Sequence, residues 1–352
     1  MPRPAPLLLR ALAAGGLVSA ASLSAASAWS KRPDYPLAPG MAGLIAGVDG
    51  DVLIAAGGAN FPGKMPWEGG KKAYYDEVFV LGSGDRAWRP AGRLPEPRAY
   101  AATVSTPRGV LVIGGENAET VFADTLVLRW DGHTLNTQRG PRLPAPRTSQ
   151  VAAVRDGSVY VAGGYAPGAA RLSTGDFWRL DLPQLESGWK KLPTWPGPTR
   201  GQAVMAATGD ALYLLSGLEM TLAADGKTQP NYLTDAYCFR AKKWERLPDL
   251  PWSAVAAPSP APTTRSPARV WVLGGVDGRL AGKQPRDTRV PNHIASLDVS
   301  TGRWIESAAR WPDPVVTAPA VAFAGEWWIV SGEIMAGVRT TGVWSLKPEL
   351  IE

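Results

Sequence analysis

The clearest pattern along the chain is a short apolar run that ends in two small residues. It occurs six times, and each run has the length and the content of β-branched or aromatic residues that are typical of a buried strand. The copies read VLIAAGG, VLVIGG, VYVAGG, LYLLSG, VWVLGG and WWIVSG, and they end at Gly58, Gly115, Gly164, Gly217, Gly275 and Gly332. Successive copies are spaced 49 to 58 residues apart. This spacing indicates one structural unit repeated six times.

A second signal closes most of the units. In four of them a Trp follows the small pair by 26 to 31 residues, at Trp88, Trp189, Trp244 and Trp304, and we expect it to open the last strand of the unit. Proline-rich turns come next, such as LPEPR and LPAPR, although the second unit has its turn without the Trp. These marks are typical of kelch repeats, in which each repeat builds one four-stranded sheet of a β-propeller around a central channel.

The composition agrees with a strand-and-turn protein. The chain has 39 Gly and 33 Pro among 352 residues, about a fifth of the total, and both residues are unfavourable inside helices. A hydrophobic content of 45% against 19% charged residues excludes a disordered chain. We therefore predict an all-β fold, a six-bladed kelch β-propeller over residues 29–352.

The two ends of the chain complement each other. The sixth unit begins at Thr317 and has no final strand of the Trp-and-Pro type, whereas Trp29–Pro39 reads like such a strand without a unit of its own. We expect the N-terminal strand to join the C-terminal blade and close the ring, because this arrangement leaves no free sheet edge.

Residues 1–28 read as a signal peptide. Arg3 and Arg10 precede an apolar run over Ala11–Leu23, and Ala26-Ser27-Ala28 fits a cleavage site. The run is shorter than the roughly 20 residues that span a bilayer, so we expect a periplasmic or secreted protein without membrane attachment after cleavage. Loss of both arginines changes the formal charge from +6 to +4, which is too weak to predict nucleic-acid binding.

The sequence offers little for metal or redox chemistry. The single cysteine, Cys238, cannot form an internal disulfide and is expected to be a small buried hydrophobe. The two histidines, His133 and His293, are isolated, which does not provide a metal site. Galactose-oxidase-like propellers hold copper beside a Tyr–Cys crosslink, but Tyr237 and Cys238 are neighbours in one strand and should face opposite ways. We expect neither metal nor cofactor.

Charged and polar residues should collect on one face of the propeller, where the turns after the small pairs meet the proline-rich turns. The candidates there are Asn60, Glu116, Tyr165, Glu219 and Glu333 from the first kind of turn and Arg98, Arg147 and Arg200 from the second. A ring of such groups around a channel mouth predicts a polar pocket. Alternatively, the arginines tie adjacent blades together.

Two of these residues break the repeat. The position directly after the small pair is a carboxylate in only two units, at Glu116 and Glu333, and repeat packing alone does not explain this asymmetry. Arg339 follows Glu333 by six residues. A carboxylate beside a fixed cation can act as a base while the cation binds an anionic substrate. The alternative is a structural ion pair.

The long segment Ala59–Tyr75 contains Trp67 and a Lys-Lys pair after two glycines. Segments of this length usually form functional walls or lids. The GGKK stretch lacks the spacing of a phosphate-binding loop and no helix is expected after it, so nucleotide binding is not predicted.

Four segments together resemble the N-acetylneuraminate epimerase, or sialic acid mutarotase, family, and in particular its cyclically permuted branch. They are Gly57–Tyr75, Arg98–Tyr100, Gly114–Glu116 and Ser331–Thr340, the last reading SGEIMAGVRT. The resemblance covers essentially the whole chain after the signal peptide. In the parent arrangement the SGE-like segment precedes the GGANF-like one, whereas here it lies at the C-terminus.

The resemblance implies a periplasmic enzyme that converts the α anomer of sialic acid to the β anomer. The family's proton acceptor falls on Glu333, and its nearby arginine falls on Arg339, which would hold the substrate carboxylate. One departure is Met335-Ala336, where the family tends to carry Lys-Pro.

We therefore expect Glu333 and Arg339 to be catalytic and a small-molecule sugar acid to be the partner. The expected substrate contacts are Arg98 and Glu116, with Asn60, Arg147 and Arg200 as further candidates. Two alternatives stay open: a mutarotase acting on another sugar, and a kelch module that binds a sugar or a protein without catalysis.

Overall fold

The computed structural model describes Met1, residues 28–283 and residues 288–351. The predicted signal peptide lies almost entirely outside the described residues. Within them the chain forms strands, turns and a few single turns of 3-10 helix, which confirms the all-β prediction. The 3-10 turns are η1 (Pro66–Glu68), η2 (Leu182–Ser187), η3 (Gly278–Leu280) and η5 (Pro348–Leu350). No helix in this part of the chain has the length and apolar character needed to cross a membrane.

The strands of the described residues form six four-stranded antiparallel sheets. The first three are β2 (Ile45–Asp49), β3 (Val52–Ala56), β6 (Glu77–Gly82) and β7 (Arg89–Arg93); β8 (Ala102–Thr106), β9 (Gly109–Ile113), β10 (Thr125–Trp130) and β11 (Leu135–Gly140); and β12 (Val151–Arg155), β13 (Ser158–Ala162), β14 (Phe177–Asp181) and β15 (Lys190–Lys191).

The fourth sheet contains β16 (Val204–Ala207), β17 (Leu212–Leu222), β18 (Thr228–Arg240) and β19 (Lys243–Leu247). The fifth contains β20 (Thr263–Arg265), β21 (Ala268–Leu273), β22 (Ile294–Asp298) and β23 (Arg303–Glu306). The sixth is β24 (Ala320–Phe323), β25 (Glu326–Met335), β26 (Val338–Leu346) and β1 (Trp29–Arg32). A separate two-stranded pair is formed by β4 (Ala59–Asn60) and β5 (Ala73–Tyr74).

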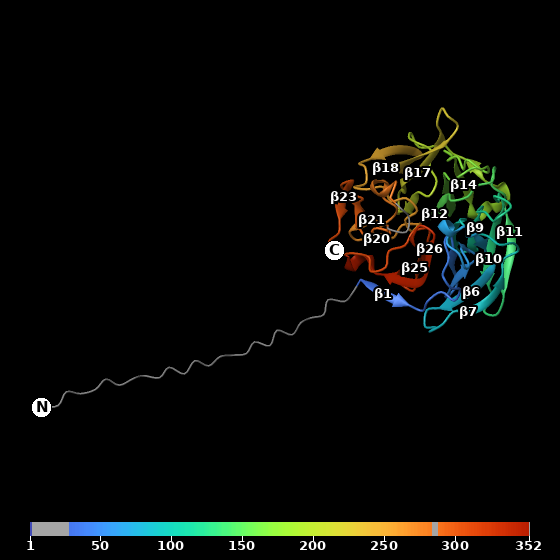
Figure 1. Ribbon diagram of the computed structural model, residues 1–352, viewed down its shortest axis with the longest axis horizontal. Coiled ribbons are helices and arrows are strands. Elements are labelled where there is room, and N and C mark those ends of the chain that lie inside the picture. Colours follow the sequence, from blue (N-terminus) through green and yellow to red (C-terminus); the bar gives the residue numbers. More distant parts are fainter. Residues whose placement is uncertain (2–27, 284–287, 352) are drawn as a thin grey trace.

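The first and last strands of the chain share one sheet. β1 runs antiparallel to β26, with Trp29 opposite Leu346 and Arg32 opposite Val343. Figure 1 shows this blue strand lying beside the red C-terminal strands. The segment after the predicted signal peptide therefore supplies the outer strand of the last sheet.

The six sheets are joined by a ring of backbone hydrogen bonds. The ring residues are Gly43, Tyr100, Ser149, Gln202, Ala256 and Thr317, one before the first strand of each sheet. Each amide donates to the carbonyl of the ring residue before it, and Gly43 donates to Thr317, at N···O distances of 2.7 to 2.9 Å. All six have φ between 50° and 61°, a conformation that costs a non-glycine residue about 1–3 kcal/mol. The hydrogen-bonded ring offsets this cost.

The small pairs of the six repeats are explained by backbone crowding. In every pair both residues have positive φ, including Ser216 and Ser331. A Cβ on Gly58 would lie 2.7 Å from Met41 Cβ, and one on Gly275 would lie 2.4 Å from Ala254 Cα. Only glycine fits so close to the neighbouring segment.

The four repeated tryptophans link each unit to the one before it. The indole N–H groups of Trp88, Trp189, Trp244 and Trp304 donate to the carbonyls of Pro33, Pro141, Pro193 and Pro248, at N···O distances of 2.9 to 3.0 Å. Because each proline belongs to the turn region of the preceding unit, the same hydrogen bond recurs around the molecule.

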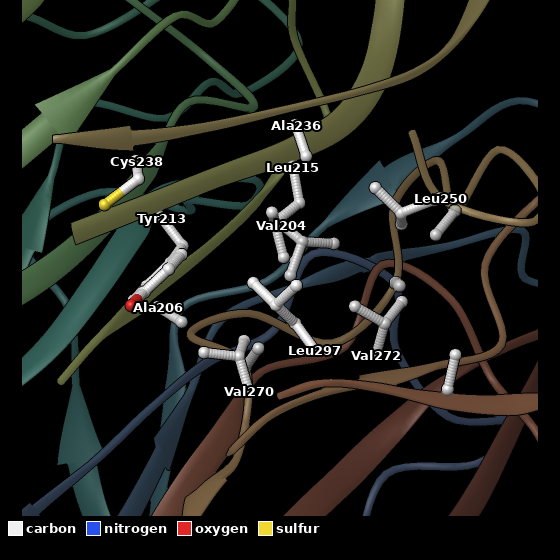
Figure 2. Packing of buried hydrophobic residues seen from close by; sticks show 14 of the residues in the cluster. Val204, Ala206, Tyr213, Leu215, Ala236, Cys238, Leu250, Val270, Val272 and Leu297 are labelled. Carbon is white, nitrogen blue, oxygen red and sulfur yellow. The ribbon is translucent and has the colours of Figure 1, made fainter. Parts of the chain in front are cut away.

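The apolar core is divided into clusters between adjacent sheets. Figure 2 shows one of them, in which Val204, Leu215 and Cys238 of the fourth sheet meet Val272 and Leu297 of the fifth. Cys238 is a buried apolar side chain, as predicted. Its neighbour Tyr237 belongs to a different cluster, so the two side chains face opposite sides of β18 as expected.

Candidate active site

Two hairpins from opposite ends of the chain form one wall of a cavity. The segment between β4 and β5 meets the turn between β25 and β26, where a Cβ on Gly337 would lie 3.0 Å from Pro66 and 3.2 Å from the Trp67 ring. The cavity has a volume of about 640 Å³. Its polar lining includes Lys72, Tyr100, Arg171, Thr317, Glu333 and Arg339.

The floor of the cavity is the hydrogen-bonded ring. Four ring residues, Tyr100, Ser149, Gln202 and Thr317, line it. The backbone of each of these four residues is hydrogen-bonded to the ring residue on either side. The cavity therefore lies against the ring, beside four of its six residues.

Glu333 is held by the segment that precedes β24 and by its own hairpin. Its backbone exchanges two hydrogen bonds of 2.9 Å with Val316. One carboxylate oxygen, Oε2, accepts a bond of 3.2 Å from the Gly337 amide, and Oε1 lies 3.4 Å from the Thr317 hydroxyl. The side chain is 14% exposed and lines the cavity. Glu333 is thus a fixed carboxylate with access to the cavity.

Arg339 stands opposite Glu333 in the hairpin. Its Nη2 lies 3.3 Å from Glu333 Oε1, and its guanidinium packs over the ring of Phe61 with 4.7 Å between the guanidinium carbon and the ring centroid. The side chain is only 2% exposed, yet Nε and Nη1 have no hydrogen-bond acceptor among the described residues. Arg339 also lines the cavity, so its guanidinium is placed to bind an anionic group there.

Two further cations, which the sequence did not single out as site residues, line the cavity. Lys72 lies just before β5, with Nζ 5.0 Å from the ring centroid of Tyr100 and 5.9 Å from that of Tyr74. Arg171 pairs with Glu116 at an Nη1···Oε2 distance of 2.9 Å. The predicted wall segment already contained Lys72, whereas Arg171 lies in a connection without a repeat signal.

The charges around the cavity do not cancel. Lys72, Arg171 and Arg339 are three cations, and only Glu116 and Glu333 are close enough to form ion pairs with them among the described residues. One positive charge is left over. A cavity of this kind favours a small anion over a neutral ligand.

Burial changes the acidity of two groups in the cavity. It lowers the pKa of Lys72, and Glu116 and Glu333 oppose part of that shift. Burial also raises the pKa of Tyr100 far above its usual value, and Glu333 raises it further. Lys72 is therefore a stronger acid than an ordinary lysine, and Tyr100 is a weaker one than an ordinary tyrosine.

Arg98 and Arg200 are not substrate contacts. Both side chains are completely buried. Arg98 Nη1 lies 3.0 Å from Asp124 Oδ1, and Arg200 donates to both carboxylate oxygens of Asp235 at 2.8 and 2.9 Å. Side chains without any exposed surface cannot reach a ligand. These internal ion pairs are in line with a structural role, the kind of role that the alternative reading of the turn arginines assumed.

The other three predicted contacts lie outside the cavity lining. Arg147 pairs with Asp176, and Asn60 is buried, where it donates to the Gly40 carbonyl and accepts a bond of 2.9 Å from the Tyr75 hydroxyl. Neither side chain is part of the cavity lining. Glu116 is also buried, but it accepts a bond of 3.0 Å from Tyr74 and holds Arg171, which does line the cavity.

The structure offers no obvious metal site. In residues 28–283 and 288–351, no group of three or more His, Cys, Asp or Glu side chains is arranged to hold a metal ion.

Comparison with known proteins adds an independent observation. The sequence model of the N-acetylneuraminate epimerase family matches residues 21–137 and 140–284. Among curated relatives, the N-acetylneuraminate epimerase of Brucella suis is 35% identical over 129 residues, which cover 32% of this chain and 33% of that protein. The protein of the same name from Yersinia enterocolitica is 33% identical over 126 residues, covering 31% and 32%. The chain thus spans about a third of the length of the curated relatives it matches.

A solved structure, "Structure of YjhT", has a TM-score of 0.62 to this chain at 14% identity, covering 90% of this chain and 95% of the other. At this identity the likeness concerns the fold alone. Glu333 and Arg339 lie beyond the residues that the family model matches. Because that model matches well over half of the chain, the protein belongs to the N-acetylneuraminate epimerase family.

Proposed function

We propose that this protein is a mutarotase that interconverts the α and β anomers of N-acetylneuraminate. The observation that carries the proposal is the meeting of Glu333 and Arg339 in a cavity with one uncompensated positive charge. A sugar acid with one carboxylate matches that charge. Membership of the family supports the same reaction.

Each residue has a defined role in the reaction. The carboxylate of Glu333 accepts the proton of the anomeric hydroxyl, which starts the opening of the ring to a keto acid. The guanidinium of Arg339, which lines the cavity, binds the substrate carboxylate. Positioned acid–base groups contribute about 10²- to 10⁴-fold in rate. Mutarotation already occurs slowly in water, so one such site suffices.

Glu116 has a supporting role in this proposal. Its ion pair with Arg171 and its hydrogen bond from Tyr74 fix two side chains at the edge of the cavity. We assign it to positioning Arg171 and not to direct contact with the sugar.

We further infer that the six sheets are the blades of a kelch β-propeller closed by β1. The ring of six backbone hydrogen bonds and the pairing of β1 with β26 support this architecture. A closed ring tolerates cyclic permutation, because its ends already meet within one blade. Permutation accounts for the C-terminal position of the Glu333 hairpin, and the leader-like residues 1–28 fit a periplasmic location.

Anomer exchange followed by NMR tests the function. A sialidase releases α-N-acetylneuraminate, and the α signal should disappear faster with the protein than without it. The variant Glu333→Gln should lose at least 10²-fold of the acceleration. Glu219→Gln is the matched control, because Glu219 bonds to Asn231 and does not line the cavity. Full activity of Glu333→Gln would remove this residue from the mechanism.

A panel of sugars separates the two alternatives that the sequence left open. Faster exchange of a neutral reducing sugar than of sugar acids would indicate a mutarotase for another substrate. Binding of N-acetylneuraminate without faster exchange would indicate a non-catalytic binding module.

A further inference from the structure

Lys72 is the one cation lining the cavity that has no carboxylate partner among the described residues. Arg171 pairs with Glu116 and Arg339 with Glu333, whereas Lys72 contacts only the ring faces of Tyr74 and Tyr100. Aromatic faces hold an ammonium group in place without accepting its protons in strong hydrogen bonds. The protons of Lys72 are therefore available to a ligand.

Its position is set by two structural constraints. The pairing of β4 with β5 places Asn60 opposite Ala73, directly after Lys72. The preceding turn is closed by a hydrogen bond of 2.9 Å from the Gly70 amide to the Met65 carbonyl. The neighbouring Lys71 is exposed and does not line the cavity. Of the two lysines, the structure brings one to the reaction site.

Ring opening needs a proton donor as well as a proton acceptor. The anomeric hydroxyl loses a proton while the ring oxygen, which leaves as the C–O bond breaks, must gain one. Glu333 is the proton acceptor of this step, so it cannot donate a proton at the same moment. Arginine keeps its protons at all ordinary pH values, and burial makes Tyr100 a weaker acid.

We propose that Lys72 is a second catalytic residue, the acid that protonates the ring oxygen of the sugar; this rests on the proposed mutarotase function. Glu333 takes the proton of the anomeric hydroxyl, the carbonyl forms, the bond to the ring oxygen breaks, and that oxygen takes a proton from the Lys72 ammonium. For closure on the other face, the neutral Lys72 amine removes the proton from the attacking hydroxyl, and protonated Glu333 returns its proton to the carbonyl oxygen. Both groups end as they began, and no co-reactant is consumed.

The surroundings of Lys72 support this role. Burial lowers the pKa of the ammonium, Glu116 and Glu333 raise it, and Arg171 and Arg339 lower it. The net lowering makes proton release to a developing alkoxide easier. Since the ammonium must be protonated to open the ring, kcat should fall as the pH rises through the lowered pKa of Lys72.

The experiment measures kcat and KM for anomer exchange against pH, corrected for the rate without protein. Lys72→Arg keeps the positive charge but is a far weaker acid, so we expect KM within about threefold of wild type and a loss of at least 10² in kcat. Lys72→Met should lose kcat and also raise KM. The alkaline fall in kcat should be absent from both variants. Lys71→Met is the matched control and should behave as wild type.

The outcomes are distinct. If Lys72→Arg keeps kcat within threefold of wild type, Lys72 only supplies charge and the proposal is wrong. An alkaline fall in kcat that persists in Lys72→Met also refutes it. If the wild-type protein does not accelerate exchange at all, the mutarotase function itself is wrong, and this is evident before any variant is examined.

Discussion

Replacing Arg200 tests whether the buried arginines are structural. The Arg200 guanidinium donates to Asp235 at 2.8 and 2.9 Å and to the Ser216 carbonyl at 2.8 Å, and its carbon lies 5.4 Å from the Trp195 ring centroid. In Arg200→Met the Asp235 carboxylate would keep only the hydrogen bond of 2.7 Å from the Tyr237 hydroxyl. Breaking a buried pair in this way costs about 3–5 kcal/mol of the free energy of unfolding.

Urea unfolding followed by tryptophan fluorescence measures this loss. The double variant Arg200→Met/Asp235→Leu should recover most of it, because no unpaired charge remains. Arg89→Met is the control, since the Arg89–Asp85 pair is exposed and is worth at most about 1 kcal/mol. In the folded fraction of Arg200→Met, KM should be unchanged. A loss below 1 kcal/mol together with a raised KM would refute the structural reasoning and return Arg200 to the substrate site.

Three other changes test the site, the ring and the closing strand. Arg339→Met should raise KM for sugar acids at least tenfold and leave KM for neutral sugars unchanged, and an equal effect on both would contradict its role as carboxylate anchor. Gly43→Ala should lower the free energy of unfolding by about 1–3 kcal/mol in urea titration, because the added Cβ would lie 2.5 Å from Tyr100 Cδ1. Unchanged stability would show that the hydrogen-bonded ring of backbone residues can shift to make room for the methyl group. Burial raises the pKa of Glu326, but hydrogen bonds from Ser345 and Arg32 outweigh it, so the pKa is below its ordinary value. The stabilisation by ionised Glu326 is present above pH of about 4.3 and is lost as the pH falls through the lowered pKa. Glu326→Gln should therefore be less stable than wild type at pH 7 and close to wild type at the acidic end of a pH titration of stability. Equal destabilisation at both ends would contradict the pairing of Glu326 with Arg32.

The repeated parts of the fold could be predicted from the sequence because each repeated motif meets a structural requirement at its own position in the unit. The second residue of each small pair marks a place where only glycine fits beside the next segment, as at Gly58, and this need recurs in each unit. Trp88 and its equivalents mark the same hydrogen bond to a proline carbonyl. Six imperfect copies made these signals clear even where a single copy was incomplete.

The direction of the turn-arginine side chains could not be predicted from the sequence in this way. The motif that ends at Arg98 fixes the position of the backbone but not the direction of the side chain. That direction depends on Asp124, a residue 26 positions away, which receives the guanidinium in the interior. Asp235 does the same for Arg200 at a separation of 35 residues. Such pairs follow from the packing of the strands and leave no mark in the turn itself.

The same difference separates the site residues that the sequence predicted from those that it missed. Glu333 was found because it departs from four of its five counterparts, and Arg339 because it follows in the same hairpin. Arg171 has no counterpart to depart from, and its place in the cavity depends on Glu116, which is distant in sequence. Comparison between repeats detects a residue that breaks a pattern, and it misses one that lies where no pattern exists.

The segment that joins the two ends of the chain also supports Glu333. The Met41 amide donates to Ser331 Oγ at 2.7 Å, and Ser331 Oγ also lies 2.7 Å from the Thr340 carbonyl, so both strands of the Glu333 hairpin meet the N-terminal segment at one hydroxyl. Two residues further on, Gly43 donates to Thr317, whose own hydroxyl lies beside the Glu333 carboxylate. The strand that completes the last sheet therefore leads directly into the contacts that position the proposed base. Weakening this junction should lower kcat along with stability, because the same hydrogen bonds serve both.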